Sequence, residues 1–566
     1  RPQFQKPHLY GILDSLSLAE GAHAIHVGFE LRAKSDEFID VQRRTPLYRF
    51  RGNFTADPAG QISSGDSVAD LLLGLPDRFT ISSSPVVNQL QQIWAGYAQD
   101  DWKVTPRLTL NLGLRYEYAT PYYGGSPNRN INFNFATGQL VRATGSDKYL
   151  VNPDKKDWGP RLGVAYQVVP DRVVLRAGYG LFYNGEDISG SDINLPLNPP
   201  QLVAVTLNKQ GPNPPLLLSD PIPNNILTQY DTSTLALRAR ERNWHTPRVH
   251  QFNVTTQFRL PSESAFEISY VGNRGHNLIA NFDANQTAFG ADPGNPANYP
   301  YPNFFQIYTG TTRGKSHYNA LELKYEKPFR RGLYLLGSYT YASAIDEAGA
   351  WGSDNQPQIR DCFACERGPM RQVPRHRFTL AGVYEIPFGR GRTLGANINR
   401  PLDALFGGWQ LSSVVTWRSG LPIDVSLDPS GTDPITGQPI SFNNIPNDYG
   451  DLRPNRVGNP NTGNSPSSNR QFLNVSGFAL QPVDTPGNSQ RNVAHGPRFG
   501  TVDLTLVKRF SLTERTKLDI RAEAFNFLNH TNYADPSQTT WGDDGFGVIN
   551  NAYDPRVVQL AVRVQF

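Results

Sequence analysis

The stretch RLTLNLGLRYEY at residues 107–118 decides the fold class, because its side chains alternate in character. Every second residue is apolar or aromatic, and the residues between them are polar, charged or glycine. A helix would scatter both sets around its axis, whereas an extended strand places them on opposite faces. The stretch therefore predicts a strand with one apolar and one polar face. The apolar set is Leu108, Leu110, Leu112, Leu114, Tyr116 and Tyr118.

The same alternation recurs along the chain, at 161–168, 172–183, 251–260 and 558–566. Leu110, Leu112, Val562 and Val564 are expected on the apolar, lipid-facing side, and Asn111, Arg115 and Arg563 on the other. Soluble sandwiches also contain alternating strands, so the alternation by itself does not decide between a sandwich and a membrane barrel.

The connections between strands decide that question. Short links at 105–106, 170–171, 261–263, 327–332 and 511–515 alternate with long polar stretches at 121–157, 184–243, 273–316, 343–373 and 420–498. Outer-membrane barrels have short periplasmic turns and long extracellular loops. In compact soluble domains, loops beyond about 12–15 residues are uncommon. The sequence therefore predicts an all-β fold, a large antiparallel transmembrane β-barrel.

About seventeen strands can be distinguished, beginning with a hairpin that turns at Glu20-Gly21. Segments 107–118 and 172–183 reach the roughly 9–11 residues that a tilted strand needs to cross a bilayer. Tryptophan and tyrosine gather at segment ends, as in the aromatic girdles of membrane barrels. Because bacterial single-chain barrels have even strand numbers, the odd count predicts that upstream strands are missing.

The composition excludes several classes of protein. Lys and Arg number 54 against 50 Asp and Glu, a net charge of +4, which provides no general surface for nucleic acid. The 50 glycines and 45 prolines exclude a coiled coil. No run approaches the roughly 18 apolar residues of a membrane-spanning helix.

No residue pattern predicts catalysis, a cofactor or a metal site. Segment 310–316, GTTRGKS, has three residues between its glycines, whereas a phosphate-binding loop needs four, and it leads into an alternating strand. The histidines lack the spacing of a metal helix. A group of arginines could contact an anion, but we interpret it as a solvated loop face. The group is Arg360, Arg367, Arg371, Arg375 and Arg377. We therefore expect no enzyme activity.

The two cysteines, Cys362 and Cys365, have the spacing of a redox motif but lie in a predicted long loop without a surrounding βαβ unit. Two thiols alone make a poor zinc site. In an oxidising envelope compartment we expect a local extracellular disulfide, with redox and metal roles as the alternatives.

Several strings resemble TonB-dependent receptors of the Oar-like group, which are related to the SusC-like transporters. The main one is YAQDDWKVTPRLTLNLGLRYE at 97–117. Similar strings are HAIHVGFELR (23–32), SVADLLLGLP (67–76), RHRFTLAGVYEIPFGRGR (375–392), GGWQLSSVVTWRSGLP (407–422) and RAEAFNFLNHTNY (521–533). Together they cover the chain from about residue 8 to its end.

This resemblance implies the barrel part of an outer-membrane receptor that imports an unknown solute without bond chemistry. A complete barrel of the family has about 22 strands, so residues 1–566 are expected to be one barrel domain that is incomplete at its N-terminus. A signal peptide, a regulatory-like domain, a plug and the first strands would be absent, and the TonB system would act through that missing region. The implied partners are outer-membrane lipid and lipopolysaccharide, and a surface lipoprotein or another envelope protein. Two alternatives remain open, a surface structural or adhesion protein anchored by its barrel and a passive porin.

The ending DPRVVQLAVRVQF resembles the terminal strand that the outer-membrane assembly machinery recognises. Phe566 is the final residue and is in phase with Val558, Leu560, Val562 and Val564. The short turn at 511–515 places the end of the last strand at the periplasmic rim, where an aromatic ring suits the interface. Phe566 is therefore predicted to be an assembly signal.

Overall fold

The computed structural model describes residues 4–39, 45–57, 64–83, 85–125, 130–185, 195–209, 212–229, 231–347, 356–446, 452–513 and 515–566. Part of the predicted 343–373 loop and one residue of the 511–515 turn therefore lie outside the described residues. Among those that are described, no helix is long and apolar enough to cross a membrane.

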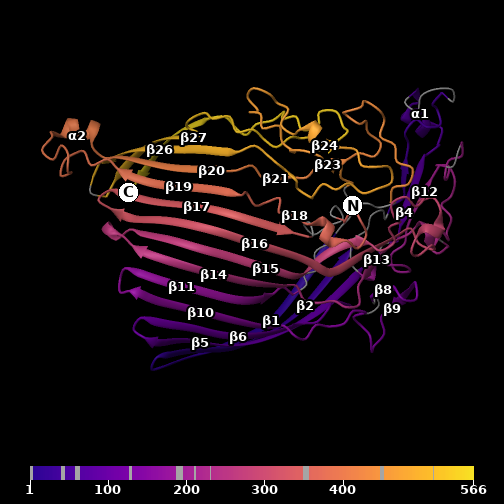
Figure 1. Ribbon diagram of the computed structural model, residues 1–566, viewed down its shortest axis with the longest axis horizontal. Coiled ribbons are helices and arrows are strands. Elements are labelled where there is room, and N and C mark those ends of the chain that lie inside the picture. The colour runs from indigo at the N-terminus through magenta and orange to yellow at the C-terminus, as the bar shows by residue number, and fades with distance from the viewer. Residues whose placement is uncertain are drawn as a thin grey trace.

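One 18-stranded sheet dominates the structure and curves into a barrel wall (Figure 1). Apart from the short β7 (Tyr123–Gly124), β13 (Ala236–Arg240) and β18 (Gly368–Pro369), its strands pair in chain order, each antiparallel to the next. They are β1 (Phe4–Glu20), β2 (His23–Ile39), β5 (Val87–Thr105), β6 (Leu108–Ala119), β10 (Trp158–Val169), β11 (Val173–Tyr183), β14 (Arg248–Arg259), β15 (Ala265–Asp283), β16 (Gln306–Arg330), β17 (Leu333–Asp346), β19 (His376–Glu385), β20 (Trp409–Arg418), β26 (Phe499–Ser511), β27 (Lys517–Phe525) and β29 (Val557–Gln565).

The register carries one apolar face across the whole wall, which we call the outer row. Directly paired residues point to the same side of a sheet. Leu112 pairs with Leu162, and Val562 pairs with Ile520, so these apolar side chains lie on one face. Asn111 pairs with Gly163 on the opposite face, and Arg563 with Asp519. The alternation thus places the two sets as the sequence predicts.

Two polar sites interrupt the outer row near the short turns, and the sequence pattern did not indicate them. Asp100 pairs with Leu112 in the outer row and lies 2.7 Å from the Nδ1 atom of His23. Lys508 also belongs to the outer row, between the rings of Trp409 and Phe510, and its ammonium group donates to the Gly407 carbonyl. Each polar group has a partner within the wall.

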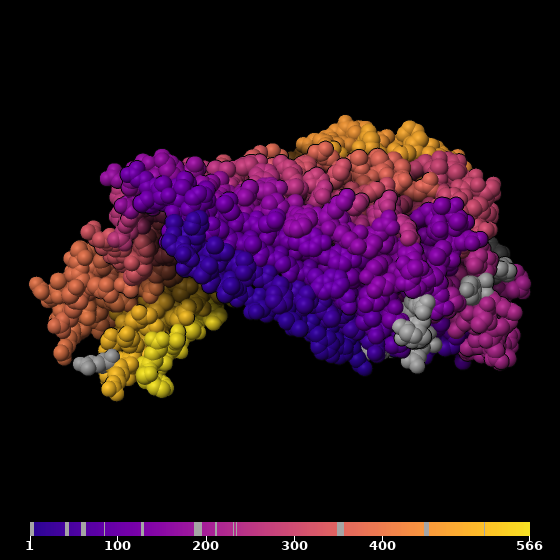
Figure 2. Space-filling model, turned by 90° about the horizontal axis from the view of Figure 1, so that it is seen from below, coloured from indigo at the N-terminus to yellow at the C-terminus, as the bar shows by residue number. Residues whose placement is uncertain are grey.

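The sheet is open, and in this it differs from a fully closed barrel. Strand β1 pairs with β2 alone and β29 with β27 alone, and no pairing joins β1 to β29 among the described residues. Figure 2 shows the indigo β1 edge and the yellow C-terminal strand bordering a gap in the wall. The described wall contains fifteen long strands, fewer than the seventeen counted from the sequence.

The two ends of the wall differ as predicted. Most turns at one end are short, and the C-terminus lies there (Figure 1). The exception is the turn between β19 and β20, which carries the helix α2 (Arg400–Phe406). The opposite end bears the long connections. In outer-membrane barrels the short turns are periplasmic and the long loops extracellular, and the two ends of the wall are named accordingly.

The long connections are folded, and some of the residues predicted to lie in loops belong to strands. Strands β15 and β16 extend far into the predicted 273–316 loop, where β13 pairs in parallel with β16. The helix α1 (Ser67–Leu72) accompanies a separate sheet of β3 (Leu47–Arg49), β4 (Arg78–Ser82) and β12 (Ala204–Asn208). The remaining strand pairs are β8 (Ile131–Asn134) with β9 (Gln139–Arg142), β21 (Pro422–Ile423) with β25 (Ala494–His495), β22 (Ser426–Leu427) with β28 (Thr540–Trp541), and β23 (Asn455–Arg456) with β24 (Phe478–Ala479). Short 3-10 helices occupy Leu195–Leu197, Thr232–Thr234, Pro261–Glu263, Pro296–Asn298, Phe363–Glu366 and Val475–Gly477.

Candidate functional site: the inner wall and the extracellular loop layer

The face opposite the outer row, which we call the inner wall, carries polar side chains that are paired across strands. The Asn111 amide donates to the Asp101 carboxylate at 2.6 Å. The Arg115 guanidinium lies 3.0 Å from Glu30 and 2.9 Å from Glu117. In this cluster opposite charges neighbour each other, so this part of the inner wall offers hydrogen-bonding groups without an excess of one sign of charge.

A cavity of about 630 Å³ opens in the inner wall between β10 and β16. Two glycines on β11 make room for it. A Cβ atom at Gly178 would lie 2.8 Å from the Asn253 Oδ1 atom, and one at Gly180 would lie 2.6 Å from the Phe182 ring. The inward-facing side chains that line the cavity are Arg161, Phe182, Gln251, Asn253, Thr255, Ser269, Val271, Asn273, Tyr318 and Glu322.

The chemistry of this lining favours a polar solute. Carboxamides and hydroxyls provide both donors and acceptors. Arg161 and Glu322 provide one charge of each sign, and the Arg161 guanidinium lies 4.9 Å from the centroid of the Phe182 ring. Apolar rings beside hydrogen-bonding groups are the usual lining of a small-molecule site.

The extracellular connections pack into a layer with its own apolar interior, which we call the loop layer. One core joins residues from segments 423–494 and 541–546, where Val425, Leu473, Phe478 and Trp541 are completely buried. Strands β22 and β28 pair in parallel and connect the two segments. A second core gathers apolar side chains of β8, β13, β15 and β16 around Phe363.

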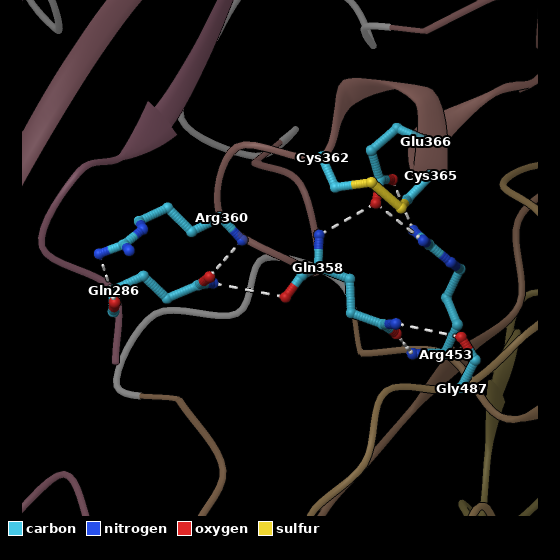
Figure 3. The surroundings of a disulfide bond; sticks show 8 residues. All are labelled: Gln286, Gln358, Arg360, Cys362, Cys365, Glu366, Arg453 and Gly487. Carbon is cyan, nitrogen blue, oxygen red and sulfur yellow. Dashed lines mark hydrogen bonds and ion pairs between the residues drawn. A yellow bond between two sulfur atoms is a disulfide. The ribbon is translucent and has the colours of Figure 1, made fainter. Parts of the chain in front are cut away.

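A buried ion pair connects these two cores (Figure 3). The Glu366 carboxylate accepts hydrogen bonds from both terminal nitrogens of Arg453, at 2.7 and 2.8 Å. The two side chains are 7% and 3% exposed. Glu366 also accepts the backbone N–H of Gln358 at 3.0 Å, and Arg453 donates to the Ser489 carbonyl. Such bidentate geometry fixes the relative orientation of the two loops.

The structure joins Cys362 and Cys365 by a disulfide with a Cα–Cα distance of 5.3 Å. The bond closes the turn that carries Phe363 into one core and Glu366 toward Arg453 (Figure 3). We propose that it stiffens this turn, which is a structural role on the extracellular side. The sequence did not indicate the ion pair between Glu366 and Arg453, because the two residues are far apart in the chain.

The other candidate residues do not converge. Segment 310–316 lies inside β16 and begins no helix. Arg360 donates to the carbonyls of Ala284 and Gln286, whereas Arg375 donates to the Tyr341 hydroxyl. Arg360 and Arg375 therefore contact different segments of the chain and do not share an anion site. Among the described residues, no group of three or more His, Cys, Asp or Glu side chains could hold a metal ion.

Phe566 follows β29 and is 98% exposed. Its proposed role as an assembly signal gives a direct prediction. Deleting Phe566 should lower the amount of folded barrel in the outer membrane severalfold, because the terminal aromatic ring would no longer be presented to the assembly machinery. The folded fraction can be measured by mobility shift of unboiled samples on gels. Normal barrel levels after the deletion would contradict the assignment.

A buried carboxyl at the extracellular rim has a perturbed pKa. Asp157 is 3% exposed and accepts a hydrogen bond from the Thr246 hydroxyl at 2.7 Å. Burial raises its pKa to about 6, and the charges of Asp154 and Glu117 act in the same direction, while the Thr246 hydrogen bond and the Arg248 charge oppose the shift.

This shift predicts a pH-dependent stability. The folded state binds the Asp157 proton more tightly than the unfolded chain, so the free energy of unfolding falls as the pH rises from about 4 to about 6. Asp157→Asn should therefore stabilise the protein at pH 8, by at most about 3 kcal/mol, and have little effect at pH 4. Unfolding rates in guanidinium at both pH values test this. Asp147→Asn, at a more exposed carboxyl, is the control and should show no such pH-dependent gain.

The chain is similar to known outer-membrane proteins. The model of a family described as "Outer membrane beta barrel domain" matches residues 1–559. The outer membrane transporter YddB from Escherichia coli has a similar structure, with a TM-score of 0.53 and 13% identity over 99% of this chain and 54% of that one. The ferric enterobactin receptor PfeA from Pseudomonas aeruginosa gives a TM-score of 0.47 and 13% identity over 100% and 54%. The chain thus spans about half the length of these proteins, and the likeness to YddB concerns the fold alone. No curated protein sequence matches the chain.

Proposed function

Because the chain belongs to the outer membrane beta barrel domain family, we propose that it is the barrel of a TonB-dependent receptor of the Oar-like, SusC-related group. The protein is located in the bacterial outer membrane. In the proposed function, the loop layer admits a solute from outside, the inner wall contacts it, and TonB drives its import without bond chemistry. We assign none of the described residues to the step that couples solute import to TonB.

The observation that supports a transport role most directly is the inner-wall cavity. It lies on the same face as the paired polar residues, and its lining combines carboxamides, hydroxyls and rings. A barrel that served only as an anchor would need no roomy hydrogen-bonding recess in its wall. The glycines at 178 and 180 keep this recess open, since a side chain at either position would collide with Asn253 or Phe182.

The test uses the full-length gene in its own bacterium. We expect a gene deletion and a TonB-inactivated strain to leave the same polar solutes unconsumed in the medium, as measured by mass spectrometry. Asn253→Leu should leave part of this set at several-fold higher levels, because it removes an amide from the cavity. Gln410→Leu, on the inner wall of β20 away from the cavity, is the matched control and should behave as wild type. A deletion strain that consumes every solute normally would contradict the proposal.

A surface adhesion role is the second candidate, and the α1 tip favours it. Val68, Leu72 and Leu73 are 59%, 82% and 61% exposed at the extracellular end of the molecule (Figure 1). Exposed apolar clusters often mark protein contacts. This candidate predicts that the deletion strain loses surface attachment while its solute consumption is unchanged.

A further inference from the structure

The outer row changes from apolar side chains to arginine, lysine and histidine at the extracellular ends of three neighbouring strands, β14, β15 and β16. Along β14 it passes from Phe258 and Val254 through Phe252 to His250 and Arg248. The register continues this change sideways, because His250 pairs with Arg274 on β15, which in turn pairs with His317 on β16. We call the resulting group the cation patch. Its members are Arg248, His250, Arg274, His276, Lys315 and His317.

The patch faces outward, on the same side as the apolar surface of the wall. Val254, Tyr270 and Leu321 belong to the same rows of β14, β15 and β16, and they are 48%, 44% and 41% exposed. In an outer-membrane barrel this surface faces lipid. The patch therefore begins where the apolar surface ends, at the level of the outer-leaflet headgroups.

Local contacts hold part of the patch in place. The Tyr179 hydroxyl lies 2.8 Å from the Nδ1 atom of His250, whose ring is 5.6 Å from that of His276. The Arg274 guanidinium lies 5.5 Å from the centroid of the Phe252 ring and donates to the Asn319 side-chain oxygen at 2.8 Å. These contacts hold the side chains of His250 and Arg274 in position within the patch.

The permanent charges of the patch form no ion pair with a carboxylate in the parts of the chain that the structure describes. Two acids lie in the neighbourhood. The Arg248 charge acts on the buried Asp157, and the backbone N–H of Glu347 donates to the Lys315 carbonyl. Arg248 and Lys315 are exposed. The three permanent cations, Arg248, Arg274 and Lys315, attract an anion, and the histidine rings beside them can hydrogen-bond to it.

At the corresponding end of the outer row, β6 and β10 present Tyr116 and Trp158, whose rings lie 4.6 Å apart, and β20 presents Trp417. These aromatic residues suit a headgroup interface without selecting a charge. Single cations lie beside two other outer-row rings, Lys155 at Tyr118 and Arg375 at Tyr341, whereas β14–β16 bring three permanent cations together. This cluster favours an anionic ligand at this place on the circumference.

We propose that the cation patch binds the phosphate groups of an anionic glycolipid of the outer leaflet, such as the lipid A part of lipopolysaccharide. The apolar rows below the patch contact the acyl chains, and the arginines and Lys315 contact phosphate. Phosphate is a good ligand for such a group, because arginine can donate two hydrogen bonds to it at once. A soluble anionic partner would use the cations but not the continuous apolar surface beneath them.

Native mass spectrometry of the folded chain in detergent, titrated with bisphosphorylated lipid A, tests the proposal. The double variant Arg248→Gln with Lys315→Gln should bind lipid A about tenfold more weakly, since each cation near a membrane surface adds to anion binding. The matched control is Arg390→Gln with Arg400→Gln, which removes two exposed cations from the periplasmic α2 turn and should bind normally. Gel mobility of unboiled samples verifies that each variant is folded.

Two further ligands distinguish the source of the phosphate. Lipid A without phosphates should bind the wild-type chain as weakly as bisphosphorylated lipid A binds the double variant. Phosphatidylglycerol should bind more weakly than bisphosphorylated lipid A. Equal binding of the phosphate-free lipid, equal binding of phosphatidylglycerol, or an equal loss in the α2 control would each overturn the assignment. These results do not depend on solute import, so they test the patch separately from the proposed function.

Discussion

Replacing Arg453 by alanine should detach the two halves of the extracellular loop layer while leaving the barrel wall intact. The variant leaves the Glu366 carboxylate buried without its bidentate partner. Removing one member of a buried ion pair costs about 3–5 kcal/mol. Because the pair links the loop layer and not the strands, the cost should appear as local opening of the loops.

Limited proteolysis of the protein in outer-membrane vesicles measures that opening. We expect cleavage within residues 421–494 to become at least about 100-fold faster, since local opening governs access of the protease. Arg242→Ala is the control, because its ion pair with Asp147 has side chains that are 57% and 36% exposed. Exposed pairs contribute about 0–1 kcal/mol, so this variant should be cleaved at nearly the wild-type rate. An equal effect of both changes would show that the buried pair does not hold the layer.

Replacement of both partners sharpens this test. Glu366→Met combined with Arg453→Met removes both buried charges together, which is often neutral in stability. The double variant should therefore recover much of the protease resistance that Arg453→Ala loses. A double variant that opens as readily as the single one would indicate that the loops depend on other contacts of these residues, such as those to Gln358 and Ser489.

An arginine in the outer row should impair assembly far more than an arginine on the inner wall. Val254 lies in the outer row of β14 beside Ala177 and Tyr270, without an acidic neighbour in the row. A cation facing lipid near mid-membrane costs about 2–4 kcal/mol. The adjacent Asn253 faces the cavity of the inner wall, where Glu322 also lies, so it should accept an arginine at small cost.

The fraction of Val254→Arg that assembles in the outer membrane should fall by more than tenfold, with Asn253→Arg near wild type, as measured by gel mobility of unboiled samples. Leu112 is a less suitable position although it faces the same way, because Asp100 lies directly opposite and would pair with the introduced arginine. Equal losses for the two changes on β14 would mean that the register differs from that described.

The strands of the wall could be predicted because the alternation of apolar and polar residues that indicates them is a local property of the sequence. In RLTLNLGLRYEY each residue's face follows from its position alone, and neighbouring strands repeat the pattern with matched pairs such as Leu110 and Val164. The loop layer gave no such signal. Trp541 is buried against residues from the 420–498 segment, and no periodicity of residues 529–555 indicates that contact.

The candidate sites also divide into those that the local sequence indicates and those that depend on contacts between distant segments. The position of Cys362 and Cys365 in a predicted loop outside the membrane, in an oxidising compartment, made a local disulfide a reasonable expectation. The cavity between β10 and β16 depends on which glycines and amides the register brings together, and that register pairs Gly178 with Asn253, about 75 positions apart in the chain.

The alternation predicted most strands of the wall and their two faces, because a period of two is a property of neighbouring residues. The packing of the long connections into a layer, the meeting of Glu366 with Arg453, and the shared outward surface of Arg248, Arg274 and Lys315 became visible only in the folded structure. Those outcomes depend on burial and on contacts between distant segments. The free energy of a buried contact is set by what surrounds it, and the sequence around either partner does not contain that information.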